Sequence, residues 1–224
     1  MNISNSAGAA TRKCLTIKAC LLFFFLPAIA AAAGDSEDQP RFGFSLDAEA
    51  PVIEMSVDIG LMRLDDPIPL LRIYGNGEAW IHYPVYMVKA GDYSLSLSPG
   101  AVEDLLTELE ALGVFDFDAK AVKATQTAIE QQRREETLRQ GQPLVLTNRS
   151  DDETTTIRVF LEWYQPRDRD EIYQDFTVRA AWHALQWEAR GFPEIEALTG
   201  LARAAELLKT FTDHPELRRW QDEE

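Results

Sequence analysis

The spacing of apolar residues changes in the middle of the chain and divides it into strands and a helix. Two short β-prone runs, 70–74 and 78–83, flank a turn that contains Asn76 and Gly77. Asn-Gly between such runs predicts a hairpin, because both residues tolerate the positive φ that matches strand twist. Apolar residues then alternate with serines over 93–98. This alternation predicts a third strand with one polar face.

The next run has the period of an amphipathic helix. Apolar residues three and four positions apart form one stripe: Val102, Leu105, Leu106, Leu109 and Leu112. Ser98 is a favourable N-cap, and Pro99 suits the first helical position. Gly113 is placed to end the helix in a left-handed conformation. We expect the stripe to cover one face of the hairpin sheet.

Strand patterns also lie on both sides of this block. Apolar and polar residues alternate over 51–59 and again over 154–164, where 144–146 supplies the first arm of a second hairpin. Residues 174–187 fit a strand and a helix equally well. A strand that pairs back onto 154–164 is favoured, because the short charged loop between the two segments suits a hairpin.

Two further segments are predicted to be helical. Residues 119–140 have a helical composition but few apolar positions, which is typical of a solvated arm or insertion. Composition does not separate an interaction arm from a lid. A second apolar stripe follows Phe192 and consists of Ile195, Leu198, Leu201, Ala205 and Leu208. We expect this last helix to break at Thr199 and Gly200.

Strands followed by a helix occur twice, without a residue-level repeat. This order predicts an α+β fold, with an antiparallel β-sheet built from hairpins, helices packed on one face, and one polar helix. The predicted organisation has four parts: a signal peptide (1–33), a flexible lead-in (34–50), a single α+β domain (51–212) and a polar tail (213–224). A domain of this length can bury a core of its own.

The N-terminus has the three parts of an export signal. A basic region with Arg12, Lys13 and Lys18 precedes an apolar run over 19–33. Small residues at the end of that run offer a cleavage site before Gly34. The run is short for a membrane span, so we expect a soluble periplasmic protein without stable membrane insertion after cleavage. The alternative is an uncleaved anchor.

Cysteine usage and charge narrow the chemistry further. Both cysteines, Cys14 and Cys20, lie within the signal, so the mature chain is expected to lack thiol catalysis, thiolate metal sites and disulfides. The formal net charge is −15, and residues 34–224 carry −18, because three of the 22 bases and none of the 37 acids lie in residues 1–33. This acidity argues against nucleic acid and anionic membranes as partners, and favours solubility or a basic partner.

No motif in the sequence marks a catalytic site. There is no G-x-S-x-G elbow, P-loop or G-x-G-x-x-G run. None of the histidines (His82, His183 and His214) stands at a metal-ligand spacing, and no acidic cluster has the form of a calcium loop. We therefore predict no catalytic residue, no metal and no cofactor. His82 and His183 both fall in predicted strands and could meet across a sheet.

The tryptophans offer a different kind of site. The chain has five: Trp80, Trp163, Trp182, Trp187 and Trp220. Tryptophans on strands can line a groove for sugars or peptides, and they can also fill a core. Trp80 and His82 alternate with Ile81, so they face away from the core if Ile81 faces it. The candidate binding residues are therefore Trp80, His82 and His183.

Several short segments resemble a group of uncharacterised exported proteobacterial proteins. They are Leu71-Arg72-Ile73-Tyr74-Gly75-Asn76-Gly77, His82-Tyr83-Pro84, the Leu-Ser-Pro helix start at 97–99, and the spacing of residues 182–185 and 192–194. The resemblance covers most of the mature chain, but the shared features are turns, caps and core aromatics. It implies export and the fold described above, and it brings no activity and no catalytic residue.

These observations favour an exported periplasmic protein with a binding or interaction role in the cell envelope, its candidate partner being an envelope protein. An enzyme is the less favoured class. One alternative is a metal- or carboxylate-dependent hydrolase, which requires His82 and His183 in one cleft beside an acid. The other is a small-ligand carrier that uses the strand tryptophans and requires an apolar cavity.

Overall fold

The computed structural model describes residues 41–59, 68–98, 100–141, 143 and 152–220. The predicted signal peptide, both cysteines and the predicted strand arm at 144–146 lie outside these residues. None of the helices in the described part of the chain is both long and apolar enough to span a membrane.

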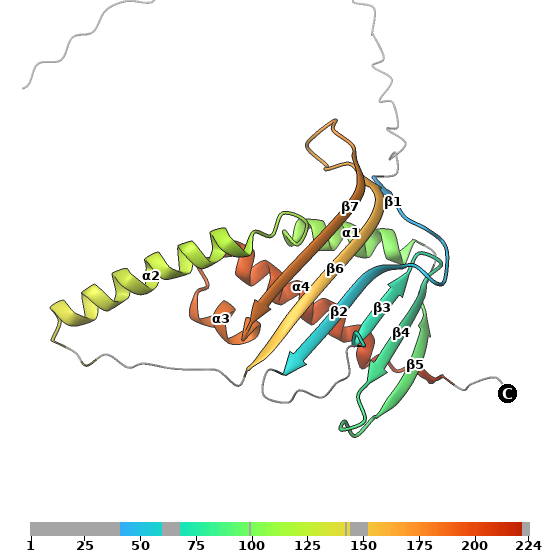
Figure 1. The fold of residues 1–224 in the computed structure, drawn as a ribbon, viewed down its shortest axis with the longest axis horizontal. Coiled ribbons are helices and arrows are strands. Elements are labelled where there is room, and N and C mark those ends of the chain that lie inside the picture. The colour runs from blue at the N-terminus through green and yellow to red at the C-terminus, as the bar shows by residue number, and fades with distance from the viewer. Residues whose placement is uncertain (1–40, 60–67, 99, 142, 144–151, 221–224) are drawn as a thin grey trace, which may run out of the picture. The chain divides into compact units, whose positions relative to one another are not determined.

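Within those residues, eight strands form one antiparallel sheet (Figure 1). They are β1 (Phe42–Gly43), β2 (Pro51–Ile59), β3 (Leu71–Tyr74), β4 (Glu78–Tyr83), β5 (Gly91–Ser96), β6 (Glu153–Tyr164), β7 (Tyr173–His183) and β8 (Arg218–Arg219). Their order across the sheet is β7-β6-β2-β3-β4-β5-β8. The short strand β1 pairs with the C-terminal end of β6, on the same side of β6 as β2. Strands β2 to β5 are consecutive hairpin neighbours, whereas β6 returns after two helices to lie beside β2.

Four helices accompany the sheet in the described residues: α1 (Ala101–Ala111), α2 (Ala119–Arg139), α3 (Leu185–Gly191) and α4 (Glu196–Thr212). Helices α1 and α4 lie behind the sheet in Figure 1. Their buried leucines form one core with the inward side chains of β2, β3, β4 and β6, such as Ile53, Ile73, Ile81 and Ile157. The predicted α+β class, an antiparallel sheet with helices on one face, is therefore confirmed. We call the opposite face of the sheet the outer face.

The predicted hairpin is present and joins β3 to β4. Leu71 pairs with Ile81 and Ile73 with Ala79, so all four side chains enter the core. Only Gly77 of the Asn-Gly pair has a positive φ, of 87°. The Asn76 side chain instead accepts a hydrogen bond from the Glu78 N–H. The turn therefore uses one left-handed glycine and one side-chain cap rather than two left-handed residues.

Helix α1 has the predicted stripe but not the predicted start. Val102, Leu105, Leu106 and Leu109 are buried, and Gly113 follows the helix with a φ of 76°. The predicted N-cap at Ser98 is wrong, because the cap is Gly100, with a φ of 83° and no side-chain cap bond. After β5 the chain reverses through this left-handed glycine, a conformation that serine adopts only at a cost.

The ambiguous segment 174–187 is divided between two elements. It is a strand as far as His183, and β7 pairs with β6 along its whole length, as favoured from the sequence. Ala184 then adopts a left-handed conformation with a φ of 52° and turns the chain into α3, which the sequence pattern did not separate from the strand. The apolar positions fitted two periods because two elements share this segment.

The predicted break in the last helix is wrong. Helix α4 continues through Thr199 and Gly200, and Gly200 is buried. A Cβ atom added at Gly200 would lie 2.2 Å from the carbonyl oxygen of Leu112, at the end of α1. Glycine is required here by the close approach of two backbones, not by the end of a helix.

Helix α2 is polar, as expected from its composition, and Asp118 caps its N-terminus by accepting from the N–H groups of Lys120 and Ala121. Its buried Val122 belongs to the core, and polar groups connect the helix to the region of α3. Gln126 bonds Glu188, and Arg133 bonds both the Gly191 carbonyl and Glu194. These contacts hold the helix alongside α3.

Candidate functional site

A single row of side chains crosses the outer face. Residues that face one another in antiparallel strands point to the same side of a sheet, so strand register identifies the row. It runs through Arg179 (β7), Arg158 (β6), Glu54 (β2), Arg72 (β3), Trp80 (β4), Ser94 (β5) and Arg218 (β8). We call these seven residues the cross-sheet row. Four of them are arginines and only one is acidic.

Contacts link the middle of the row. The Glu54 carboxylate lies 3.2 Å from Nε of Arg72 and 3.6 Å from a guanidinium nitrogen of Arg158. The Arg72 guanidinium also lies over the Trp80 ring, 5.0 Å from its centroid. A cation above an indole face is attracted by the ring quadrupole, which orients both groups. Glu54 and Arg72 therefore hold the Trp80 ring in place from one side.

A groove of about 320 Å³ opens on the outer face beside Trp80. Its polar and aromatic lining consists of Arg72, Tyr74, Glu78, Trp80, Ser94, Ser96 and Trp220. Trp220 follows β8 and is 54 % exposed. Its backbone N–H donates a hydrogen bond to the Asp92 carbonyl, which fixes its position. Two indole rings and a phenol ring thus share the groove with serine hydroxyls and charged groups. Such a mixture of aromatic walls and a few polar groups is typical of ligand sites.

The structure places Trp80 and His82 on the outer face, since Ala79 and Ile81 between and beside them are buried. The two rings stack with centroids 5.6 Å apart. The His82 side chain is only 12 % exposed, and its Nδ1 lies 2.6 Å from the Asp92 carboxylate. Trp80 therefore lines the groove, and His82 packs against its ring.

His183 does not join this pair. It lies at the end of β7 opposite Thr154, whose hydroxyl is 3.4 Å from its Nδ1. Strands β6, β2 and β3 separate β7 from the strand of His82, which is about 19 Å at ordinary strand spacing. The hydrolase alternative required the two histidines in one cleft, and the fold does not bring them together. Among the described residues no three acidic, histidine or cysteine side chains converge as metal ligands.

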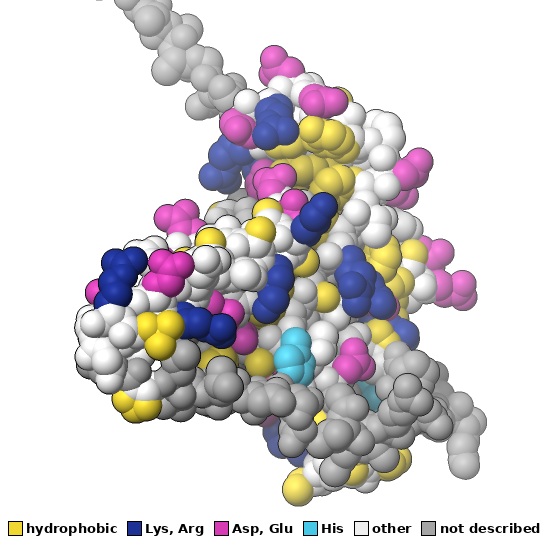
Figure 2. Space-filling view, turned by 60° about the vertical axis from the view of Figure 1, so that its left-hand side comes forward, with side chains coloured by type: hydrophobic (Ala, Val, Ile, Leu, Met, Phe, Trp, Pro, Cys, Tyr) yellow, Lys and Arg dark blue, Asp and Glu magenta, His cyan; other side chains and the backbone are white. Residues whose placement is uncertain are grey.

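Figure 2 shows basic, acidic and hydrophobic side chains together on one face of the molecule. Lys and Arg side chains (dark blue) are interspersed with hydrophobic ones (yellow) across the centre of the face in view, above an exposed histidine (cyan). The formal charge of the whole chain, −15, therefore does not describe every part of the molecule. The binding properties of one surface follow from the charges on that surface.

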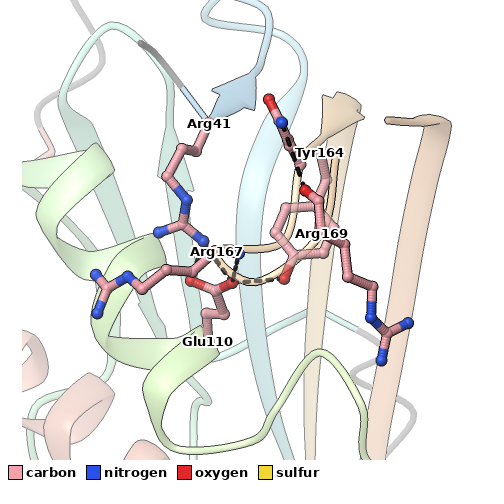
Figure 3. Close-up of polar contacts among 6 residues, drawn as sticks. Arg41, Glu110, Tyr164, Arg167 and Arg169 are labelled. Carbon is pink, nitrogen blue, oxygen red and sulfur yellow. Dashed lines mark hydrogen bonds and ion pairs between the residues drawn. The ribbon is translucent and has the colours of Figure 1, made fainter. Parts of the chain in front are cut away.

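A second polar cluster surrounds Glu110, near the end of α1 (Figure 3). A guanidinium nitrogen of Arg41 lies 2.5 Å from both carboxylate oxygens. The Tyr164 hydroxyl donates to the same carboxylate at 2.7 Å, and the Arg167 N–H donates at 3.3 Å. These contacts join a residue before β1, a residue in α1, and two residues at and just after the end of β6, so the cluster ties three distant segments together.

The protonation behaviour of this cluster argues for a structural role. Burial by itself would raise the pKa of Glu110, but the hydrogen bonds from Arg41 and Tyr164 and the charge of Arg41 outweigh it and lower the pKa. Burial, followed by the bond to the Glu110 carboxylate, raises the pKa of Tyr164. An ionised carboxylate that accepts hydrogen bonds from three segments of the chain fits a role in joining those segments.

The Glu110 cluster was not visible in the sequence. Its members lie 54 and 69 positions apart, and none belongs to a motif. The one available signal was an acid on the polar side of the α1 stripe. The cross-sheet row was also missed, because its register depends on β6, which follows β2 by about a hundred residues.

The loop after β4 exposes a group of apolar side chains that the sequence analysis did not single out. Val85, Tyr86, Met87 and Val88 are all exposed. Tyr86 and Met87 border a hollow of only about 80 Å³ near His82. This hollow is much smaller than the groove at Trp80, which is therefore the stronger candidate site.

Comparison with known proteins gave no relative: no protein-family model, no curated protein and no solved structure matches this chain. The described residues form an α+β fold with an aromatic groove and a row of arginines on the outer face of its sheet.

Proposed function

We propose that this protein is an exported, periplasmic binding protein that recognises a saccharide of the cell envelope through the groove at Trp80. The observation that carries the proposal is the groove itself. Trp80, Trp220 and Tyr74 line it together with serine hydroxyls and charged side chains. The C–H face of a pyranose ring packs on an indole, while its hydroxyls take hydrogen bonds from the surrounding polar groups.

The position of the groove favours a saccharide over a peptide. Extended peptides commonly bind along the edge of a sheet, where backbone N–H and C=O groups are available. The groove at Trp80 lies on the face of β3, β4 and β5, whose backbone groups are engaged by neighbouring strands. A ligand on this face is contacted mainly by side chains, as suits a flat ring with many hydroxyls.

The cellular location rests on the sequence. The basic and apolar parts of residues 1–33 support export, and the absence of cysteine after residue 33 fits a mature chain without disulfides. Osmotic shock is expected to release the protein with Gly34 as its N-terminal residue, as measured by intact mass. Retention of residues 1–33 in a membrane fraction would contradict this location.

Replacing Trp80 with alanine is expected to weaken saccharide binding at least about tenfold, because the variant loses the main stacking surface. Co-sedimentation with isolated peptidoglycan sacculi, whose strands are the glycan of the periplasm, measures the effect. Tyr86→Ala is the matched control, since Tyr86 is an exposed aromatic residue that does not line the groove.

Two results would count against the proposal. One is that the unaltered protein does not co-sediment at any concentration tested. The other is that Trp80→Ala and Tyr86→Ala bind as well as the unaltered chain, which would place the binding surface elsewhere.

A further inference from the structure

We infer that the saccharide taken by the groove at Trp80 is acidic, with carboxylates that pair with the arginines of the cross-sheet row. The inference rests on the proposed function and adds the chemical class of the ligand. Its basis is the juxtaposition of an aromatic groove with cations on both sides. Arg72 stands one strand from Trp80 in one direction, and Arg218 stands two strands away in the other.

The charges in the row are unusual for this chain. The row holds four arginines and one glutamate, whereas the whole sequence has 22 bases against 37 acids. Glu54 is shared between Arg72 and Arg158, so one carboxylate serves two guanidinium groups. Arg179 and Arg218 form no ion pair with any residue in the described ranges. Guanidinium groups in excess of local carboxylates provide sites for a ligand carboxylate.

The spacing along the row suits a polymer. Neighbouring strands lie about 4.8 Å apart, so the row spans about 29 Å from Arg218 to Arg179. One strand spacing is comparable to the length of a pyranose unit. A chain of uronic acid rings laid across the strands therefore presents a carboxylate near each arginine while one ring stacks on Trp80.

Acidic side chains near the groove weaken the attraction between the arginines and a ligand carboxylate but do not reverse it. Glu54 lies within the row, Glu78 lines the groove, and Asp92 bonds His82 beside it. Asp47 and Glu49 flank Ala48, which also lines the groove, so they add negative charge beside it. Acids more than about 8 Å from the groove act only weakly, because charges at that separation are largely screened at physiological ionic strength. The ligand therefore responds to the local arginines rather than to the net charge of the protein.

Titration calorimetry with two matched probes tests the inference on the protein purified from periplasm. The probes are hexagalacturonate and its fully methyl-esterified form, which has the same rings without the charges. The acid is expected to bind at least about tenfold more tightly than the ester, because charge-assisted hydrogen bonds are lost on esterification. This preference is expected to shrink as salt is raised from low to physiological concentration.

Variants separate charge recognition from stacking. Arg218→Gln and Arg158→Gln are each expected to weaken binding of the acid several-fold more than binding of the ester. Trp80→Ala is expected to weaken both probes. Arg203→Gln is the matched control, because Arg203 is an exposed arginine on α4, on the other side of the sheet.

The outcomes distinguish the claim that the ligand is acidic from the claim that the groove binds a saccharide. Equal binding of acid and ester, both lost in Trp80→Ala, overturns the acidic class and leaves the saccharide groove standing. Binding of hexaglutamate as tight as that of hexagalacturonate overturns the inference by reassigning the site to acidic peptides. Binding of neither probe at millimolar concentration, with co-sedimentation on sacculi retained, overturns the inference alone, whereas absence of co-sedimentation as well overturns the proposed function.

Discussion

Replacing Gly200 with alanine is expected to destabilise the protein by at least about 2 kcal/mol, although alanine is the better helix former by about 1 kcal/mol. The added Cβ would lie 2.2 Å from the carbonyl oxygen of Leu112. Backbone atoms cannot rotate away as a flexible side chain can, so α4 must move away from the end of α1. That movement loosens the leucine contacts of both helices, and overpacking of this kind costs about 1–3 kcal/mol or more.

Urea denaturation of the Gly200→Ala variant measures this effect directly. Gly191→Ala is the matched control, because Gly191 also lies in a helix, has no positive φ, and has open space where its Cβ would stand. The control is expected to change stability by less than about 0.5 kcal/mol. A Gly200→Ala protein as stable as the control would show that α1 and α4 do not approach as described.

The second large effect is expected for Glu110→Gln, which should lower the free energy of unfolding at pH 7 by about 2 kcal/mol. The side chains of Glu110 and Arg41 are only 14 % and 18 % exposed. Without the carboxylate, the Arg41 guanidinium keeps its charge in a largely buried position. Glu108→Gln, an exposed neighbour on the same helix, is the control and is expected to be nearly neutral.

The difference in stability between the unaltered chain and Glu110→Gln is expected to depend on pH in one direction. The folded protein lowers the pKa of Glu110 from an ordinary value of 4.5, so the carboxylate contributes stability above that value. The contribution is lost as pH falls from about 4.5 through the lower pKa of the folded state. The stability gap between the unaltered chain and Glu110→Gln should be constant from pH 7 to 6 and should shrink below pH 4.5. A gap that persists at pH 2 would contradict the role given to ionised Glu110.

Local signals predicted much of the fold. Alternation identified β2, β5 and β6, the Asn-Gly pair located the hairpin of β3 and β4, and a leucine stripe located α1. These signals are local because side-chain period and turn chemistry belong to a few neighbouring residues. The predicted fold class followed from their order along the chain.

The errors occurred where distant contacts decide local structure. Gly200 was interpreted as a helix break because its partner, Leu112, is 88 positions away in the sequence and not visible from it. Ser98 was chosen as an N-cap on residue type, whereas the chain reverses through Gly100. The segment predicted as a polar tail contains β8, whose pairing with β5 also brings Trp220 to the groove. In each case tertiary structure overrode a local preference.

The candidate site was predictable only in part. The orientation of Trp80 and His82 followed from alternation with Ile81. The separation of His82 from His183 and the alignment of four arginines in one row depend on strand order, which no short pattern determines. The expectation of a basic partner came from net charge, and the arginines of the outer face lead to the opposite inference for this groove.

The central claim is that the groove at Trp80 binds a saccharide, and the tryptophan indole N–H signals in a proton–nitrogen spectrum test it most directly. The protein is titrated with soluble glycan fragments released from sacculi, and signals are assigned with single Trp→Phe variants. The signals of Trp80 and Trp220 are expected to shift, whereas that of Trp182, which packs against Phe117 on the helix side of the sheet, should stay in place. A shift of Trp182 with Trp80 and Trp220 unchanged would contradict the account.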